Sequence, residues 1–451
     1  MNPPRPFAAV ILAAGKGTRM KSDIHKVLHP IAGRPMIEHL LAALAGLGAT
    51  RTVVVVGSGR DQVEPVVRAH GGDTVVQEPQ LGTAHAVRQA EGLLSDFDGD
   101  VLVLYADVPL VEAQTMVRML ERLNATDSPA AVVLGFRPAD PLAYGRVIAH
   151  SDGTIAKMVE YKDATEEERR EDLCNSGLLA ARSAELWPLL AAVRDDNAAG
   201  EFYLPDIVMH AAAAGRPSAV IETGPAEVAG VNSRAELAAL EARWQERRRE
   251  RAMADGVSLV APETVWFSFD TEIGRDTVVE QNVVFGPGVA VGEGARIRAF
   301  SHLEGARVAK GAEIGPYARL RPGADIGEKA KVGNFVEVKK SRLAAGAKAN
   351  HLSYIGDAEV GAGANIGAGT ITCNYDGFFK YKTVIGEGAF IGSNSALVAP
   401  VTIGDGAIVG AGSVVTADVE ADALALARGT QQARPGWAAR FRAAMKAKKG
   451  R

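Results

Sequence analysis

The hydrophobic residues in the first half of the chain fall into short runs that alternate with amphipathic stretches. Residues 8–12, 52–56, 101–105 and 131–134 are almost wholly apolar, whereas residues 35–47 and 113–123 carry the mixed pattern of helices. Strands that are apolar on both faces and alternate with helices are typical of an α/β fold, because helices then cover both sides of the sheet. The pattern predicts a Rossmann-like parallel sheet, whose ligands bind at the carboxyl ends of the strands.

The second half has an apolar residue at every sixth position. Three sets of six positions keep this period, with a slip of one residue between the first set and the second. All eighteen residues are aliphatic or phenylalanine: Ile273, Val279, Phe285, Val291, Ile297, Leu303, Val308, Ile314, Leu320, Ile326, Val332, Val338, Ile385, Ile391, Leu397, Ile403, Val409 and Val415.

A period of six fits neither a helix, with its period of about 3.6, nor an ordinary strand, with its period of about 2. It fits a triangular coil with three short sides, in which the branched side chain points inward and small residues form the corners. The repeat therefore predicts a left-handed parallel β-helix. It loses its period between Val338 and Thr383. We expect a long insertion there, and an insertion in a rigid solenoid is a common place for function.

The two halves meet in a helix-forming stretch. Residues 234–254 contain neither Gly nor Pro and are rich in Ala, Glu, Arg and Leu, which predicts one exposed helix. We divide the chain into residues 1–234, a helical linker of residues 235–255, and residues 256–451. Alternatively, the helix is the last surface helix of the first domain. The tail after Gln431 carries seven cations and no acidic residue, and we expect it to be solvated and irregular.

Composition excludes several classes of protein. The chain of 451 residues has 50 basic and 54 acidic side chains, a net charge of −4, so it has no general attraction for nucleic acid or an anionic membrane. Its two cysteines, Cys174 and Cys373, can build neither a disulfide framework nor a zinc site alone, which favours a reducing cytoplasm. The apolar run at residues 7–14 is far too short to span a bilayer.

A glycine-rich loop follows the first predicted strand. It contains Gly15, Lys16, Gly17 and Arg19, so backbone N–H groups and two cations could meet a phosphate. The loop matches neither the dinucleotide-binding pattern nor the P-loop pattern, and a tight structural turn explains it equally well. Further polar and glycine positions lie at predicted element ends: Lys26, Gln77, Gly82 and Thr83.

Asp107 follows the apolar strand that ends at Tyr105. It therefore presents a carboxylate at the ligand edge of the sheet, where Mg²⁺ could bridge it to phosphate oxygens. The alternative role for a lone Asp at this place is the N-cap of a following helix.

The irregular region of the second half holds His351 among cations, amides and tyrosines. This setting favours catalysis, although most of the nine histidines of the chain are expected to be packed or solvated. The neighbouring polar residues are Lys339, Tyr354, Asn365, Asn374, Tyr375 and Lys380.

With these motifs the chain resembles, over nearly its whole length, the family of bacterial bifunctional N-acetylglucosamine-1-phosphate uridylyltransferases and glucosamine-1-phosphate N-acetyltransferases. Beyond the glycine-rich loop, the resemblance rests on Ala143-Tyr144-Gly145-Arg146, Val159-Glu160-Tyr161-Lys162, Cys174-Asn175-Ser176-Gly177 and Gly230-Val231-Asn232. One departure is Ala106, where the family usually has Gly between Tyr and Asp. Its methyl group could alter the affinity for the sugar.

The resemblance implies uridylyl transfer in the first half. A sugar-phosphate oxygen attacks the α-phosphorus of UTP and expels pyrophosphate, and charge neutralisation by Mg²⁺, Lys26 and Arg19 replaces a protein nucleophile. Asp107 and Asn232 would hold the metal, and Gly145, Glu160 and Asn175 the amino sugar. The full set implied for UTP and the UDP-sugar is Leu12, Ala13, Ala14, Gly15, Lys26, Gln77, Gly82, Thr83, Tyr105, Ala106, Asp107, Gly145, Glu160, Asn175 and Asn232.

The resemblance also implies acetyl transfer in the second half, with His351 as the general base that takes a proton from the sugar amine as it attacks acetyl-CoA. The positions implied for glucosamine phosphate are Arg321, Lys339, Tyr354, Asn365 and Lys380. Those implied for acetyl-CoA are Ala368, Asn374, Tyr375, Ser393, Ala411 and Arg428.

The family assembles as homotrimers through the β-helix, so the partners expected here are small molecules and further copies of the chain. The expected product is UDP-N-acetylglucosamine, a cell-envelope precursor. Two rivals stay open: a single-activity sugar-1-phosphate nucleotidyltransferase whose β-helix only oligomerises or regulates, and a non-catalytic nucleotide-sugar sensor or assembly scaffold.

Overall fold

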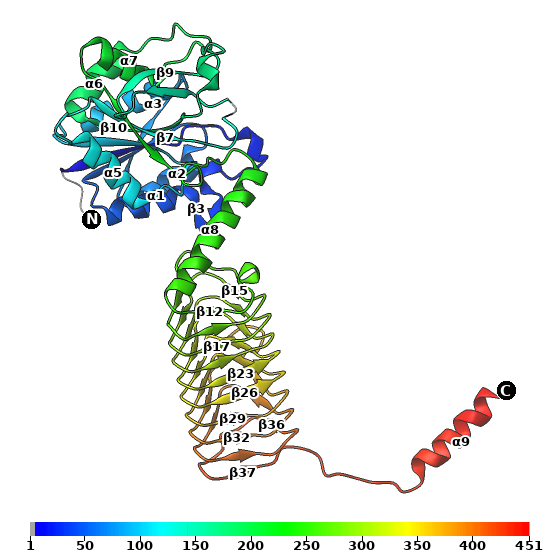
Figure 1. The fold of residues 1–451 in the computed structure, drawn as a ribbon. Helices are drawn as coiled ribbons and strands as arrows, with labels where there is room; N and C mark the ends of the chain where they lie inside the picture. The colour runs from blue at the N-terminus through cyan, green and yellow to red at the C-terminus, as the bar shows by residue number, and fades with distance from the viewer. Residues whose placement is uncertain (1–4, 142, 451) are drawn as a thin grey trace. The chain divides into compact units, whose positions relative to one another are not determined.

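The computed structural model describes residues 5–141 and 143–450. The chain forms two compact units, Met1–Arg247 and Arg248–Arg451, and the division falls inside helix α8 (Arg234–Ala254). Figure 1 shows an α/β unit followed by a stacked solenoid. Each unit is described by itself below.

The first unit is built on a nine-stranded sheet, in which seven strands follow the order β11-β7-β10-β6-β1-β4-β5. These strands are β1 (Phe7–Leu12), β4 (Arg51–Val56), β5 (Asp73–Val76), β6 (Asp100–Tyr105), β7 (Ala131–Phe136), β10 (Cys174–Arg182) and β11 (Ala219–Thr223). β1 pairs in parallel with β4 and β6.

The sheet departs from the predicted parallel arrangement at β10, which runs antiparallel between β6 and β7. β10 follows the antiparallel hairpin of β8 (Arg146–Ala149) and β9 (Ile155–Val159), and the partner of Cys174 is Arg146. The chain enters β10 from a hairpin, without a crossover helix, and a connection of this kind reverses the strand direction.

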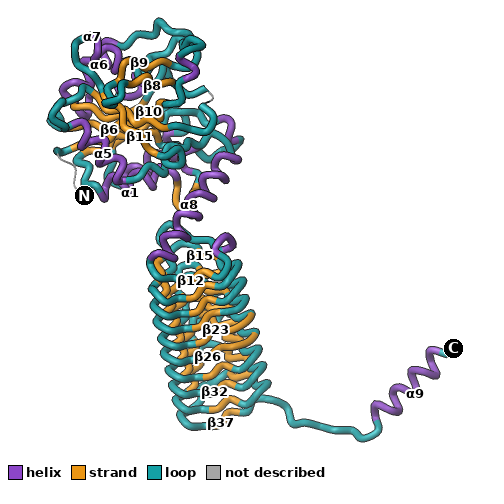
Figure 2. Tube along the Cα trace, in the orientation of Figure 1, coloured by secondary structure: helices purple, strands orange, loops and turns teal. Residues whose placement is uncertain are grey.

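Helices cover both faces of this sheet, as predicted. Along β1, Ile11 packs into one core with Leu40 and Met116, whereas Val10 packs into the other with Leu186. Figure 2 shows helices flanking the strands of this unit. The helices are α1 (Met36–Gly46), α2 (Arg60–Ala69), α3 (Thr83–Arg88), α4 (Glu91–Leu94), α5 (Ala113–Leu123), α6 (Ser183–Ala192) and α7 (Asp206–Ala213).

The second unit consists of three stacks of parallel strands, which confirms the predicted β-helix. Stack 1 has ten strands from β12 (Ser258–Leu259) to β37 (Leu424–Ala425). Stack 2 has eight strands from β15 (Val284–Phe285) to β36 (Val414–Val415), and stack 3 has eight from β13 (Glu272–Ile273) to β34 (Val401–Ile403). Each coil of the chain passes through stacks 1, 2 and 3 in turn. Of the eighteen periodic residues all but Ile273 are buried, so the period marks the inward positions.

The coils also continue where the sequence pattern predicts an interruption. Between Val338 and Ile385 the inward residues are Leu343, Ala349, Ile355, Val360, Ile366 and Thr372, spaced five or six apart. The long insertion is therefore wrong for most of this stretch. Shortened coils and the small inward residues Ala349 and Thr372 hide the period. The true insertion lies between β30 (Ile371–Cys373) and β31 (Thr383–Ile385), where Tyr375 pairs antiparallel with Lys380.

The tail differs from its prediction as well. Trp437–Lys449 form helix α9, in an alanine-rich stretch that contains no Gly or Pro. Alanine has the highest helix propensity, which outweighs the charge repulsion expected of the cations. Arg451, the last of those cations, lies outside the described residues. Among the residues that the structure describes, no helix is long and apolar enough to cross a membrane.

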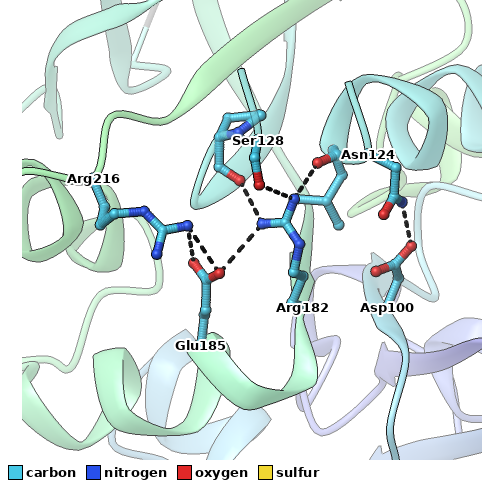
Figure 3. Close-up of polar contacts among 8 residues, drawn as sticks. Asp100, Asn124, Ser128, Arg182, Glu185 and Arg216 are labelled. Carbon is cyan, nitrogen blue, oxygen red and sulfur yellow. Dashed lines mark hydrogen bonds and ion pairs between the residues drawn. The ribbon is translucent and has the colours of Figure 1, made fainter. Parts of the chain in front are cut away.

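A partly buried arginine, Arg182, bonds to several segments of the first unit at the sheet edge opposite the ends of β1 and β6. In the register of β10 and β6, Arg182 lies opposite Asp100, the first residue of β6. Its guanidinium donates to the carbonyl oxygens of Leu123 and Pro129, at 2.5 and 2.9 Å, to Ser128 Oγ at 2.8 Å, and to Glu185 at 3.3 Å. Figure 3 shows Ser128 and Glu185 meeting the Arg182 guanidinium, with Arg216 bonded to Glu185 from the other side.

Arg182→Ala is expected to lower the free energy of unfolding of this unit by about 2 to 3 kcal/mol, because it leaves buried acceptors without a donor. The measurement is urea unfolding followed by the helical circular dichroism signal, to which α1 to α7 contribute. Arg216→Ala is the control, since the Arg216 side chain is 48% exposed and its ion pair with Glu185 should contribute about 0.5 kcal/mol or less. Equal effects of the two changes would contradict this account of Arg182.

Candidate active sites

A cavity of about 330 Å³ lies at the carboxyl ends of β1 and β6. It brings together ten of the residues predicted for the nucleotide: Leu12, Ala13, Ala14, Gly15, Lys26, Gln77, Gly82, Thr83, Tyr105 and Asp107. Four further lining residues were not predicted: Val27, Gln80, Ala86 and Glu201. The cavity therefore lies at the predicted edge of the sheet, and the loops that line it carry its polar groups.

The glycine-rich loop approaches Lys26 closely. Gly17 has a φ of 59°, and a Cβ built on it would lie 2.7 Å from Lys26 Cβ. A side chain at this position would therefore displace Lys26 from the cavity. Arg19, in the short helix η1 (Thr18–Met20), is exposed and is not among the residues that line the cavity.

Lys26, Asp107 and Asn232 form a polar cluster at the cavity wall. Lys26 Nζ makes a short ion pair with Asp107 Oδ2 and donates to Asn232 Oδ1 at 3.3 Å. The Asp107 carbonyl oxygen accepts from Val231 N at 2.9 Å, which brings the Gly230–Asn232 segment beside the end of β6. Two side-chain oxygens thus converge on one cation.

This donor set suits Mg²⁺, which prefers carboxylate and other oxygen ligands and keeps several water or phosphate ligands. The ammonium of Lys26 contacts Asp107 Oδ2 and Asn232 Oδ1, so a single cation can reach both oxygens. No group of three or more His, Cys, Asp or Glu side chains arranged for a metal occurs in the described part of the chain. A metal here would therefore take only a minority of its ligands from the protein.

The N-terminus of α8 fixes the backbone of Asn232. Glu236 Oε2 accepts from Asn232 N at 2.6 Å and from Ser233 N at 2.8 Å, and Ser233 Oγ accepts from Glu236 N at 3.3 Å. This is a capping box, whose sequence signature is Ser or Thr followed three residues later by Glu. Glu236 was not among the predicted residues, although Ser233 and Glu236 carry that signature.

The three residues predicted for the amino sugar lie together. A Cβ built on Gly145 would be 3.2 Å from the Glu160 carboxylate, and Asn175 N donates to the Gly145 carbonyl oxygen at 2.9 Å. Gly177 connects them to the cavity, because a Cβ there would lie 2.8 Å from the Tyr105 ring. Burial and the nearby carboxylates of Asp206, Asp163 and Glu201 raise the pKa of Glu160.

Tyr105 and Ala106 point in different directions. The phenol of Tyr105 lines the cavity, and burial together with the Asp107 carboxylate raises its pKa. Ala106 is fully buried and packs into the core that also holds Met116, so it does not line the cavity. Its extra methyl group is accommodated among core side chains.

Gln80 and Glu201 lie in loops, where no periodic signal could find them. Gln80 Nε2 donates to the Ala14 carbonyl oxygen. Next to Glu201, Phe202 N donates to the Leu81 carbonyl oxygen at 2.8 Å, and the Phe202 carbonyl oxygen accepts from Ala84 N at 2.9 Å. These bonds hold the Glu201 loop against the start of α3, and so against the predicted nucleotide residues.

In the second unit, five predicted residues form a column along the corner between stacks 1 and 2. Backbone hydrogen bonds join successive coils: Gly369 N to the His351 oxygen at 3.2 Å, Asn394 N to the Ala368 oxygen at 2.7 Å, and Gly412 N to the Ser393 oxygen at 2.8 Å. Arg428 extends the column, because its Nη1 donates to the Ala411 carbonyl oxygen at 2.6 Å. The column is His351, Ala368, Ser393, Ala411 and Arg428.

The residue types at this corner differ before and after His351. On the coil of His351 and the coils before it, the corner carries exposed apolar side chains: Phe300, Tyr317, Phe335 and Leu352. The three aromatic rings stack, with centroids 4.9 Å apart between Phe300 and Tyr317 and 5.1 Å between Tyr317 and Phe335. On the following coils two of the corresponding corner residues are glycines with positive φ, Gly369 and Gly412. No side chain projects from these two corner positions, which leaves room beside the column for an elongated ligand.

Four of the residues predicted for glucosamine phosphate gather at stack 2. Arg321, Lys339 and Tyr354 lie along it, and Lys380 lies in the insertion that follows β30. Arg321 Nη1 pairs with Glu337 Oε1 at 2.8 Å, and Glu337 lies opposite Tyr354 in the strand register. The Lys380 ammonium beside Lys339 lowers the pKa of Lys339. Two adjacent cations of this kind attract a doubly charged phosphate.

Three other predicted residues lie away from the column within one chain. Asn365 belongs to stack 1, where it pairs with Lys348. Asn374 and Tyr375 follow β30, at the edge of stack 2 opposite the column; Asn374 Nδ2 donates to Asp357 at 2.5 Å, and Tyr375 is exposed. The residues predicted for acetyl transfer thus occupy both edges of stack 2.

Comparison with known proteins finds a family match in each unit. Residues 9–202 match the MobA-like NTP transferase domain, and residues 382–417 match the bacterial transferase hexapeptide (six repeats). Curated relatives that carry the name Bifunctional protein GlmU include the following three. The one from Rhizorhabdus wittichii is 72% identical and covers 99% of this chain and 98% of its own length. The one from Sphingopyxis alaskensis is 66% identical, with 98% of each chain covered.

The third relative, from Zymomonas mobilis, is 59% identical and covers 98% of this chain and 99% of its own length. Similarity of this degree over both units shows that the chain belongs to the family of bifunctional GlmU proteins.

Proposed function

We propose that this enzyme carries out its two transfers at two separate sites, one in each unit. It acetylates glucosamine 1-phosphate with acetyl-CoA and then transfers a uridylyl group from UTP to the product, which yields UDP-N-acetylglucosamine and pyrophosphate. The observation that carries the proposal is the column from His351 to Arg428, because the first unit alone would also suit a single-activity nucleotidyltransferase. We assign residues 1–234 to uridylyl transfer, 235–255 to a helical linker and 256–451 to acetyl transfer.

In the first unit the sugar-phosphate oxygen attacks the α-phosphorus of UTP and pyrophosphate leaves. Lys26 neutralises charge on the phosphates, and Arg19 turns inward from its exposed position to meet them once UTP is bound. Mg²⁺, held by Asp107 and Asn232, supplies further charge neutralisation when it is present. Positioning and charge suffice for such a reaction, so no residue forms a covalent intermediate.

The cavity orients the two substrates. The backbone of residues 12–15 and the groups at Gln77, Gly82 and Thr83 hold the uridine nucleotide. Gly145, Glu160 and Asn175 hold the amino sugar beyond Tyr105. A buried carboxylate such as Glu160 accepts hydrogen bonds from sugar hydroxyls, which fixes the sugar for in-line attack.

The raised pKa of Glu160 predicts a pH dependence of sugar binding. Because the pKa is raised, the carboxyl takes up a proton at a higher pH than an ordinary Glu, and the protonated form is the poorer acceptor. The KM for N-acetylglucosamine 1-phosphate should therefore increase as the pH falls from about 7 to about 5. Glu160→Gln should have a higher KM at pH 7 with a smaller dependence on pH. Identical pH profiles of KM for the two proteins would contradict this role.

In the second unit His351 accepts a proton from the amine of glucosamine 1-phosphate as the nitrogen attacks the thioester carbonyl. Acetyl-CoA lies along the column past Ala368, Ser393 and Ala411 towards Arg428. Arg321, Lys339 and Lys380 hold the phosphate of the acceptor. The neutral form of the imidazole is the one that can accept this proton.

We further propose that the enzyme acts as a homotrimer. Within one chain, His351 lies at one edge of stack 2, whereas Lys339, Lys380, Asn374 and Tyr375 lie at the other. A neighbouring copy that brings its second edge to the first would complete the site, and the exposed aromatic corner gives such a copy an apolar surface to cover. Sedimentation of the full chain tests the trimer. The cytoplasm remains the expected location, because both cysteines are free thiols.

The experiment that tests the proposed function is release of free coenzyme A thiol from acetyl-CoA, with glucosamine 1-phosphate as the acceptor and no UTP. Acceptor-dependent release is expected. No release from a folded protein that still forms pyrophosphate from UTP would favour the single-activity rival, in which the β-helix only oligomerises.

A further inference from the structure

Asn334 lies directly beside His351 on the preceding coil. β23 (Lys331–Asn334) pairs with β26 (Lys348–His351), and in this register Asn334 is the partner of His351. Leu352 N donates to the Asn334 carbonyl oxygen at 3.0 Å, which fixes the two backbones relative to each other. His351 Nδ1 and Asn334 Oδ1 are 2.7 Å apart.

This contact selects one form of the imidazole. An amide oxygen can only accept a hydrogen bond, so His351 Nδ1 must carry the proton. In a neutral imidazole the other nitrogen, Nε2, then has the free lone pair.

We propose that Asn334 is a positioning residue for acetyl transfer, which holds His351 in the Nδ1–H form so that Nε2 accepts the proton of the acceptor amine. The inference rests on the proposed role of His351 as the base. As the C–N bond forms and the C–S bond breaks, one amine proton moves to Nε2, and the imidazolium returns it to the departing thiolate. The Nδ1–H bond to Asn334 stays intact throughout.

The charges around the imidazole explain why an amide suits this place better than a carboxylate. A cavity of about 280 Å³ beside His351 is lined by Arg298, Glu313 and Lys331, and both cations pair with Glu313. Lys348 lies on β26 itself, β29 (Asn365–Ile366) presents Asn365, and β27 (Tyr354–Gly356) presents Tyr354. Asn334 adds no charge to this set. A carboxylate would hold the imidazole protonated to a higher pH and so remove the base.

Two substitutions separate orientation from charge. Asn334→Ala should lower kcat of acetyl transfer about 10-fold or more, with little change in the KM values, because the imidazole loses its orientation but no substrate contact is removed. Asn334→Asp keeps an acceptor at Nδ1 but adds a charge. It should move the acidic limb of the kcat profile to higher pH by about one unit or more.

Asn350→Ala is the matched control, because it removes an amide from the same cavity, whereas the structure shows no hydrogen bond between its side chain and His351 among the described residues. Its acidic limb should stay at the wild-type pH. Uridylyl transfer in the same preparations reports correct folding. Selective ¹⁵N labelling of histidine, with the His351 signals assigned by their loss in His351→Gln, should show the Nδ1–H form in the wild-type enzyme and a mixture in Asn334→Ala.

An unchanged kcat for Asn334→Ala together with an unmoved acidic limb for Asn334→Asp would overturn the inference. So would an Nε2–H form of His351 in the wild-type spectrum. Failure of the proposed function looks different: His351→Ala would then retain acetyl transfer, whatever the Asn334 variants do.

Discussion

Asp107→Asn is expected to lower uridylyl transfer by about 10³-fold and to leave acetyl transfer near the wild-type rate. The carboxylate is the charged member of the pair of oxygens that converges on Lys26 Nζ. An amide in its place can still accept a hydrogen bond, but it removes the charge that would hold a divalent cation and that pairs with Lys26. Loss of one preorganised electrostatic group in an active site costs about 10²- to 10³-fold, and weaker metal binding adds to it.

The measurement is pyrophosphate release from UTP and N-acetylglucosamine 1-phosphate, alongside thiol release from acetyl-CoA in the same preparation. Binding of Mn²⁺, followed by electron paramagnetic resonance without substrates, gives a readout of the metal site that does not depend on turnover. Asp98→Asn is the control, since this side chain is 98% exposed and pairs only with Arg5 among the contacts described. Equal loss of both activities in a folded variant would argue against separate sites.

His351→Ala is expected to lower acetyl transfer by about 10² to 10⁴, the usual contribution of a general base. The KM for acetyl-CoA should change little, because the column below His351 is formed by backbone and by small side chains at Ala368 and Ala411. Uridylyl transfer should be unaffected.

Release of thiol from acetyl-CoA with glucosamine 1-phosphate as the acceptor provides the check. His302→Ala is the matched control: His302 is exposed on stack 2 in β18 (His302–Leu303), two coils before the strand that bears Lys339. Retention of the wild-type rate by His351→Ala would remove this histidine from the role of base.

The positions of most strands and helices could be predicted from the sequence, because each depends on neighbours only a few residues away. The apolar run that becomes β6 and the amphipathic stretch that becomes α5 show this directly. The same locality explains the errors. The direction of β10 depends on a hairpin that the chain makes before it, and the hidden coils between Val338 and Ile385 depend on Ala349 and Thr372, which are inward only because neighbouring coils cover them.

For the candidate sites, the sequence supplied the residue types and the structure supplied their assembly. The loop from Leu12 to Gly15 and the strand-end Asp107 could be found because residues at the ends of parallel strands share one edge. Glu201 and Gln80 could not, because they reach the cavity from loops with no pattern. Asn334 could not either, since its contact with His351 requires knowing that 17 residues separate equivalent places on two successive coils.

The sequence by itself determined that this chain would have an α/β unit with a nucleotide edge and a β-helix, because strand runs, turns and a period of six are all encoded in short stretches. Only the tertiary structure decided which side chains meet. It aligned His351, Ala368, Ser393, Ala411 and Arg428 in one column, placed Lys339 and Lys380 at the other edge of stack 2, and brought Asn232 to Asp107. The physical reason is that such contacts depend on the register between strands distant in sequence, which is set by the packing of the whole unit.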